Sequence, residues 1–372
     1  MKPSTLDRSR IALQAFGVRR GTYLLGRILA SAGLSACGLR HAWVKSRPNP
    51  AFPRTLDDFK LFAIVGTWME ADVVEATVKN AFEQGCDRVL VVDNASSDGT
   101  VATAVRAGGE LIHSFATGSY DEQMRIRLMN ETVWRVSLAD GAEHIWWLWL
   151  DADEFPHGPS GLTIRDYLAT LDRSFRTVGA RFINHYPGDE PHYVPGFHPL
   201  DFQPLCEELH SYMCWSFHRK HPLQRFDRGR PPIESDIGLH RASSADRPLL
   251  EPTVPIFEHH FPFRQKEVSL RRLEMLFSKP GGSSSRADPD HVASTHMLVR
   301  LRNFEAVYEG DWEAVDRAIA PDCRRPRIVP IPWTELVEPE HVHVRRWYPE
   351  QQVEGSDQVG EPTTREVPQR VF

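Results

Sequence analysis

The chain contains 372 residues, of which 41% are hydrophobic and 25% are charged, and its formal net charge is −6. This composition is typical of a folded protein with a large core, and the acidic balance gives no reason to expect nucleic acid as a partner. The five Cys residues are widely spaced and include no Cys-x-x-Cys pair. This argues against a disulfide framework or a structural zinc site and favours a cytoplasmic location.

Residues 1–56 are predicted to form a basic arm and linker. Residues 1–55 contain ten Lys or Arg residues and a single acidic residue, Asp7. The longest apolar stretch in the arm is interrupted by Arg27 and by glycines, so we do not expect it to cross a membrane. Apolar residues such as Leu24 and Ile28 lie beside basic ones. This pattern is compatible with peripheral contact with an anionic membrane face, and a helix packed on the main domain or a flexible arm is the alternative.

Short apolar runs alternate with amphipathic segments between residues 57 and 155. The apolar runs predict strands at Lys60–Gly66, Arg88–Asp93, Glu110–His113 and Ile145–Leu150. The intervening segments predict helices at Asp72–Gln84, Thr100–Ala107 and Tyr120–Ala139. Strands and helices alternating at this spacing favour an α/β fold, with a Rossmann-like, mostly parallel sheet flanked by helices.

The alternation fades beyond Phe155. Strands are predicted at Val178–Ile183 and Tyr212–His218, and helices at Gln265–Phe277 and Val292–Ala320. The last residues are polar and interrupted by prolines. We therefore expect a helical extension over residues 266–335 and a weakly ordered tail over residues 336–372.

The fourth predicted strand ends in three carboxylates, Asp151, Asp153 and Glu154. A strand without polar alternation is buried on both faces, and the carboxyl ends of such strands border the ligand crevice of open α/β folds. Two Asp residues at positions i and i+2 point the same way from an extended backbone. Together they can hold a divalent cation, which in turn can bind a phosphate.

Two motifs, in order and spacing, resemble those of family 2 glycosyltransferases. These are the turn Asp93-Asn-Ala-Ser-Ser-Asp98-Gly-Thr100 and the segment Trp-Leu-Asp151-Ala-Asp153-Glu154-Phe155. They are similar to the DNxSxDGT and DxDEF motifs of one branch, and Glu258-His259-His260-Phe-Pro-Phe-Arg264 is also similar to a segment of that branch. The resemblance covers residues 60–275 and implies a GT-A fold, with a glycosyltransferase domain over residues 57–265.

The resemblance also implies a nucleoside-diphosphate sugar as donor and Mn²⁺ or Mg²⁺ as cofactor. By resemblance, Asp93 contacts the nucleoside base, and its neighbour Asn94 belongs to the same nucleotide-sugar site. Asp151 would lie at the ribose and the metal, and Asp153 would bind the metal. The chemistry agrees, because a cation held by carboxylates stabilises the charge that builds on a departing diphosphate.

The loop after the first strand departs from the family pattern. Relatives often carry Asn-Glu-Glu, whereas this chain has Thr67-Trp68-Met69-Glu70. We expect Thr67 and Trp68 to contact the nucleotide. Trp68 can stack on the base, and a core position is the alternative.

A later histidine completes the metal shell in many GT-A enzymes, and His259 is our candidate for that role. Strand alternation allows only one of His259 and His260 to face the site. His240 is a weaker competitor, and a pair of loop histidines packed among aromatic residues is the alternative.

An inverting transferase needs a general base, ordinarily a carboxylate, and we select Glu208. The other candidates are Asp189, Glu190, Glu207, Glu234 and Asp236. A basic cluster is a candidate for neutralising the diphosphate, with a solvated loop as the alternative, and consists of Arg219, Lys220, Arg225, Arg228 and Arg230. Arg264 and residues 271–272 are further candidates to reach the diphosphate.

The function expected from this resemblance is a metal-dependent, inverting glycosyltransferase acting on a glycan, lipid or small-molecule acceptor. A nicotinamide-dependent oxidoreductase is disfavoured because the first strand is not followed by Gly-x-Gly-x-x-Gly. A dehalogenase-type phosphatase is disfavoured because its Asp-x-Asp normally ends the first strand. A catalytically silent protein that binds nucleotide sugars or acts as a scaffold is the alternative from another class.

Overall fold

The computed structural model describes residues 55–56, 58–117, 121–187, 193–208, 219–239, 241–246, 248–278, 304–314 and 331–336. The chain divides into two units, Met1–Arg54 and Thr55–Phe372, and the described residues belong to the second. The predicted arm up to residue 54, the strand predicted at Tyr212–His218 and the tail from residue 337 lie outside them. None of the described helices combines the length and apolar character needed to cross a bilayer.

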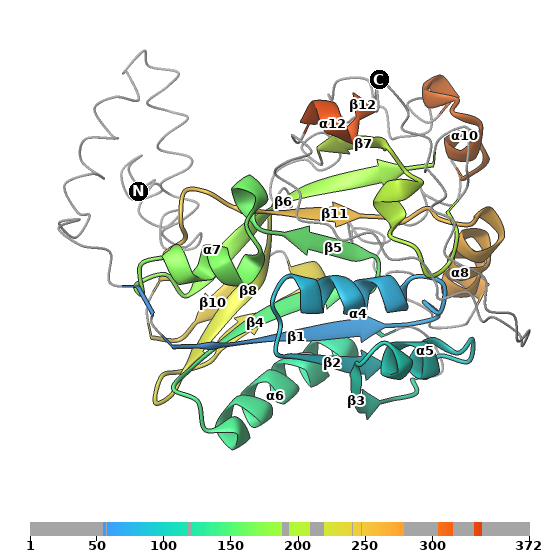
Figure 1. Ribbon diagram of the computed structural model, residues 1–372. Coiled ribbons are helices and arrows are strands. Elements are labelled where there is room, and N and C mark those ends of the chain that lie inside the picture. Colours follow the sequence, from blue (N-terminus) through green and yellow to red (C-terminus); the bar gives the residue numbers. More distant parts are fainter. Residues whose placement is uncertain are drawn as a thin grey trace, which may run out of the picture. The chain divides into compact units, whose positions relative to one another are not determined.

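The main sheet has the strand order β12-β7-β6-β8-β4-β1-β2-β3, and β5 and β11 pair off this path (Figure 1). Its first four strands are mutually parallel and are β1 (Lys60–Thr67), β2 (Arg88–Asp93), β3 (Glu110–Ser114) and β4 (His144–Asp151). These are the four predicted strands, and each prediction agrees to within a residue at either end.

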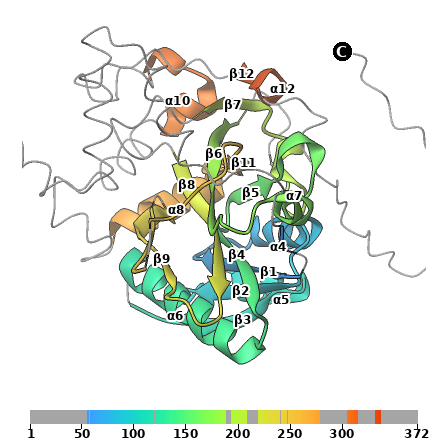
Figure 2. The same cartoon turned by 90° about the vertical axis from the view of Figure 1, so that its left-hand side faces the viewer.

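Two helical layers cover this parallel part of the sheet because its strands are apolar on both faces. On one face, Leu61 and Trp146 pack with residues of α4 (Val74–Glu83), α5 (Thr100–Arg106) and α7 (Ile164–Thr170). On the other face, Phe62, Trp147 and Trp149 pack against α6 (Glu122–Asp140). Figure 2 shows α4 and α6 on opposite sides of β1 and β2. Successive strand residues thus belong to different cores, as a strand buried on both faces requires.

The other half of the sheet is mainly antiparallel. It contains β5 (Glu154–His157), β6 (Thr177–Tyr186), β7 (Leu205–Glu208), β8 (Arg219–Asp227), β11 (Ile256–His260) and β12 (Ile331–Pro332). β8 runs antiparallel to both β4 and β6, whereas β11 is parallel to β6 and antiparallel to β5. β9 (Ile233–Ser235) and β10 (Ala242–Ser244) form a separate two-stranded sheet. The predicted fold class, an α/β sheet of GT-A type flanked by helices, is confirmed.

Three short 3₁₀ helices, η1 (Pro159–Gly161), η2 (Pro199–Asp201) and η3 (Ile237–Leu239), lie in loops. The described C-terminal helices are α8 (Lys266–Ser278), α10 (Phe304–Glu309) and α12 (Trp333–Leu336). α8 confirms the helix predicted at Gln265–Phe277. α8 and α10 pack through Leu273, Phe304 and Val307 in an apolar cluster that also contains Trp68 and Tyr186.

Candidate functional site

The carboxyl ends of three parallel strands meet at one edge of the sheet. Gly66 of β1 is in register with Asp151 of β4, and Thr67 of β1 is in register with Asp93 of β2. A cavity of about 130 Å³ lies at this edge. Its lining contains Gly66, Thr67, Trp68, Glu70, Arg125, Asp151, Ala152, Asp153, His260, Pro262, Ser269, Arg272 and Leu273. The fold thus brings together Thr67, Trp68, Asp151 and Asp153, which were predicted from separate segments of the sequence as site residues.

Asp93 ties the ends of β1 and β2 together. The hydroxyl of Thr67 donates to Asp93 Oδ1 at 2.8 Å, and the backbone amide of Ser96 donates to Asp93 Oδ2 at 2.8 Å. The backbone amide of Asn94 donates to the carbonyl of Thr67 at 3.0 Å. The side-chain Nδ2 of Asn94 is buried and donates to no group among the described residues. It is therefore a buried donor at the edge of the site.

The later part of the same turn holds the loop that carries Glu70. Asp98 accepts the amide of Ala71 at 3.1 Å and that of Thr100 at 3.0 Å, and the hydroxyl of Thr100 accepts the amide of Glu70 at 2.7 Å. Met69 adopts a φ of 57°, in the left-handed region. These bonds give Asp98 and Thr100 a role that the sequence pattern, read as turn chemistry alone, did not reveal.

Trp68 lies at the boundary between the cavity and the core. Its side chain is 8% exposed and packs in the cluster that contains Tyr186, Phe263 and Leu273. The same residue lines the cavity. The core position considered for Trp68 is therefore present, and stacking on a base stays a prediction.

Two cationic side chains hold Asp151. Arg125 Nη1 from α6 pairs with Asp151 Oδ1, and Lys220 Nζ from β8 lies 3.4 Å from Asp151 Oδ2. Arg125 lies against Gly66, where an added Cβ would come within 2.5 Å of Nη1. Burial raises the pKa of Asp151, but Arg125 and Lys220 outweigh burial, so the pKa falls below the ordinary value. Asp151 is therefore an ionised group fixed in place by its neighbours.

A second group of side chains can hold a metal ion. One ligand atom from each of Asp153, Glu154 and His260 lies within 4.8 Å of the others. His260 is opposite Glu154 in the β5–β11 pair, and its Nε2 lies 3.7 Å from Asp153 Oδ2. The other ring nitrogen of His260 is 2.7 Å from Asn184 Oδ1, which orients the ring as the partners of metal-bound histidines commonly do.

His259 faces the opposite side of β11. Its Nε2 lies 3.0 Å from His157 Nε2, and its Nδ1 lies 2.7 Å from His185 Nε2, in a fully buried cluster of imidazoles. The selection of His259 as the metal ligand is therefore corrected, because His260 is the member of the pair beside Asp153. Strand alternation separated the two residues but could not indicate which one faces the carboxylates.

Two arginines that follow β11 in the chain, Arg264 and Arg272, lie near Asp153. Arg264 is 1% exposed and donates from Nη2 to Glu70 Oε2 at 2.8 Å and from Nε to Asp72 Oδ2 at 2.6 Å. Its Nη1 lies 3.6 Å from Asp153 Oδ2, and Arg272 also pairs with Glu70. Arg264 and Arg272 thus lie beside the carboxylates and hold the loop after β1 in place, and their contact with a diphosphate stays a prediction.

Carboxylates outnumber permanent cations around the cavity. Among the residues that the structure describes, seven carboxylates meet four cations, counting Glu70, Asp72, Glu122, Asp151, Asp153, Glu154 and Glu258 against Arg125, Lys220, Arg264 and Arg272. Burial raises the pKa of Glu258 to about 7, that of Glu70 to about 8 and that of Glu154 well above its ordinary value. The surplus acidic groups therefore favour either protons or an added cation.

The remaining candidates are spread over the molecule or lie outside the described residues. Glu208 ends β7, but its side chain, like that of Glu207, lies outside the description, as do Asp189, Glu190 and His240. Glu208 stays a prediction. Glu234 and Asp236 line a different cavity of about 540 Å³ against α6.

The basic cluster is divided between the two edges of the sheet. Lys220 reaches the carboxyl edge, where its Nζ also pairs with Glu154. Arg225 lies opposite Trp146 of β4 and belongs, with Arg228 and Arg230, to the amino edge. The antiparallel direction of β8 causes this separation, which the sequence did not indicate.

Comparisons with known proteins give partial structural matches. No protein-family model and no curated protein matches the chain. Similar solved structures include glucosyl-3-phosphoglycerate synthase from Mycobacterium tuberculosis with Mn²⁺, UDP and glucosyl-3-phosphoglycerate, at 14% identity and a TM-score of 0.22, covering 33% of this chain and 44% of that one. Another structure of that synthase matches at 15% identity and a TM-score of 0.23, over 33% of this chain and 44% of that one. The chain thus spans less than half the length of the proteins it matches.

Proposed function

We propose that the protein is a metal-dependent glycosyltransferase that moves a sugar from a nucleoside-diphosphate donor to a glycan, lipid or small-molecule acceptor. The observation that carries the proposal is the grouping of Asp153, Glu154 and His260 within 4.8 Å at the carboxyl edge of the parallel strands. This edge is where open α/β folds bind ligands.

The donor set fits a divalent cation. Carboxylate oxygens suit both Mg²⁺ and Mn²⁺, and one imidazole nitrogen is compatible with Mn²⁺. The excess of carboxylates over cations around the cavity supports the same assignment. A divalent cation held here supplies stabilisation of the negative charge that develops on the departing diphosphate.

The chain's own residues would bind and orient the donor. The Nδ2 of Asn94, which has no partner among the described residues, offers a hydrogen bond to a nucleotide oxygen or base, beside the turn that Asp93 holds. Arg125 and Lys220 keep Asp151 ionised and fixed next to the metal ligands. Because these groups are already positioned, little reorganisation accompanies nucleotide binding. We further propose that Glu208 serves as the general base for the acceptor hydroxyl.

The test is a calorimetric titration of UDP and GDP into the full-length protein, with and without Mn²⁺. We expect binding to require Mn²⁺ and to weaken by about 100-fold or more in Asp153→Asn. The control is Glu131→Gln, which removes an exposed carboxylate of α6 paired with Arg127 at 3.6 Å. Nucleotide binding of equal strength in wild type and Asp153→Asn would overturn the proposed site.

Hydrolysis of a UDP-sugar or GDP-sugar separates the enzyme from its silent alternative. A transferase releases the nucleoside diphosphate in the presence of Mn²⁺, and Asp153→Asn abolishes the release. Tight, Mn²⁺-dependent binding of donors without any release or transfer would instead identify a nucleotide-sugar-binding protein.

A further inference from the structure

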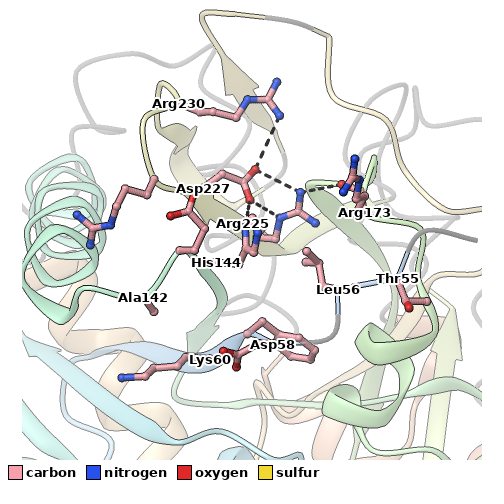
Figure 3. A pocket seen from close by; sticks show the side chains of 13 residues that line it. Thr55, Leu56, Asp58, Lys60, Ala142, His144, Arg173, Arg225, Asp227 and Arg230 are labelled. Atoms are coloured by element: carbon pink, nitrogen blue, oxygen red, sulfur yellow. Dashed lines mark hydrogen bonds and ion pairs between the residues drawn. The ribbon is translucent and has the colours of Figure 1, made fainter.

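A second cavity, of about 700 Å³, lies at the amino edge of the sheet (Figure 3). Lys60 begins β1, His144 begins β4 and Asp227 ends β8, so the cavity is at the opposite end of these strands from Asp153. Cavities of about 300–1,000 Å³ accommodate small organic ligands.

The lining carries more positive than negative charge. Among the described residues of the lining, five cationic side chains, Lys60, Arg173, Arg225, Arg228 and Arg230, face three carboxylates, Asp58, Glu143 and Asp227. Lys60 and Arg230 are also paired with Asp140 and Asp246, which lie outside the lining. The described lining of the carboxyl-edge cavity has the opposite balance, with three carboxylates, Glu70, Asp151 and Asp153, against Arg125 and Arg272. An anion is therefore the charged ligand that the amino edge favours.

Asp227 is already neutralised by its neighbours. Arg225 Nε lies 2.7 Å from Asp227 Oδ1, Arg176 Nε lies 2.8 Å from Oδ2, and His144 Nδ1 lies 2.8 Å from Oδ1. Arg230 Nη1 is a further 3.8 Å from Oδ2. Figure 3 shows Arg230, Arg225 and His144 gathered around this carboxylate. Arg176 and Arg230 also pair with Asp246, at 3.4 and 2.9 Å, so two carboxylates are shared among three arginines and one positive charge remains at the cavity.

Arg225 is a fixed anchor in the cavity wall. Its side chain is buried, its Nη2 donates to the carbonyl of Arg173 at 2.8 Å, and its guanidinium lies 5.5 Å from the centroid of the Trp146 ring. A guanidinium held by a carboxylate, a carbonyl and an aromatic ring loses little freedom when it binds an anion. Planar guanidinium groups match phosphate oxygens particularly well.

Arg228 adds a charge whose hydrogen bonds go to neutral groups. Its Nη2 donates to the carbonyls of Ser137 and Leu138, at 3.3 and 3.4 Å, in the last turns of α6. Leu56, Phe59 and Ala142 supply an apolar part of the lining. The cavity therefore combines basic groups for an anionic head with apolar surface for the rest of a small molecule.

We propose that this amino-edge cavity binds the phosphate group of a small phosphate ester or of a phospholipid headgroup. The site uses none of the residues around Asp153 and does not depend on the proposed transferase function. The same phosphate chemistry has a soluble and a membrane source, and the two are separated by experiment.

The first experiment titrates inorganic pyrophosphate into the full-length protein in EDTA, which removes divalent metal from the carboxyl edge. We expect saturable binding that weakens by about tenfold or more in the double variant Arg173→Glu, Arg230→Glu, because two cations that contact the cavity are reversed. Arg241→Glu is the matched control, since Arg241 is 60% exposed and lies outside the lining.

The second experiment compares sedimentation with phosphatidylcholine vesicles that contain or lack phosphatidic acid. Co-sedimentation that requires phosphatidic acid, is competed by pyrophosphate and is lost in the double variant identifies a lipid headgroup as ligand. Pyrophosphate binding without co-sedimentation identifies a soluble phosphate ester. The proposal is overturned if wild type does not bind pyrophosphate, or if the double variant and Arg241→Glu weaken binding equally. Circular dichroism of each variant confirms that it is folded.

Discussion

The two edges of the sheet carry opposite charge and differ in how that charge is held. At the carboxyl edge, buried carboxylates interlock with Arg125, Lys220 and Arg264 around a cavity of about 130 Å³. At the amino edge, arginines surround Asp227 and border a cavity of about 700 Å³. Because parallel strands end together, residues far apart in the sequence accumulate at one edge, and each edge acquires its own chemistry. β8 contributes to both edges with a single run of nine residues.

The largest effect on stability should come from removing the charge of Lys220, which pairs with both Glu154 and Asp151 at the carboxyl edge. Lys220→Met leaves Glu154 and Asp151 without a shared partner, and breaking a buried ion pair costs about 3–5 kcal/mol. The measurement is the free energy of unfolding in urea. Lys79→Met is the control, because Lys79 pairs with Glu75 on the surface of α4, where such a pair contributes about 0.3–0.5 kcal/mol. Equal losses of unfolding free energy in the two variants would show that the ion pairs of Lys220 stabilise the protein no more than a surface pair does.

A second, smaller effect concerns pH. Burial raises the pKa of Glu258 from 4.5 to about 7, so the folded protein binds a proton there that the unfolded chain releases. The stability from this proton is complete below pH 4.5 and is lost as pH rises to 7. In metal-free protein, we expect the free energy of unfolding of wild type relative to Glu258→Gln to fall by about 2–3 kcal/mol across this range. A difference that is constant with pH, measured by urea unfolding in EDTA, would contradict the raised pKa.

The smallest predicted effect is on nucleotide affinity and tests the contact between Arg125 and Gly66. Gly66→Ala places a methyl group 2.5 Å from Arg125 Nη1 and 2.9 Å from Cδ, so the guanidinium must shift away from Asp151. We expect Mn²⁺-dependent UDP binding to weaken by about tenfold, because Arg125 no longer orients Asp151. The free energy of unfolding should fall by about 1–3 kcal/mol, because the added methyl group overpacks the site. Arg125→Lys should weaken UDP binding similarly. Full affinity in both variants would exclude a role for the Arg125–Asp151 pair in the donor site.

The sequence predicted the parallel half of the fold and the position of the carboxylates. A six-residue apolar run ending at Asp151 is a local pattern, and local patterns are enough to locate strands and the edge at which they end. In the antiparallel half, the strand predicted at Val178–Ile183 is confirmed as β6 (Thr177–Tyr186). The pairing of β8 between β4 and β6 was not predicted, because it depends on contacts between segments about 75 and 40 residues apart, which leave no local periodicity.

The partners of the site residues were hidden for the same reason. Arg125 lies on a helix whose sequence gives no indication that one arginine reaches the end of β4, and Lys220 was one of five clustered cations. The choice between His259 and His260 required the register of β11 against β5, since neighbouring residues on a strand face opposite sides. Motifs therefore located the site, and tertiary register decided which side chains complete it.

The burial of β4 has a spectroscopic consequence. Trp146, Trp147 and Trp149 are all enclosed in the core, and Trp149 is two residues from Asp151. Indoles shielded from water emit fluorescence at shorter wavelengths than hydrated ones, so the strand that delivers the carboxylates contains its own optical reporter. The chain has ten Trp residues, so a red shift during urea titration would mark the exposure of the sheet's centre in a variant whose other Trp residues are replaced by Phe.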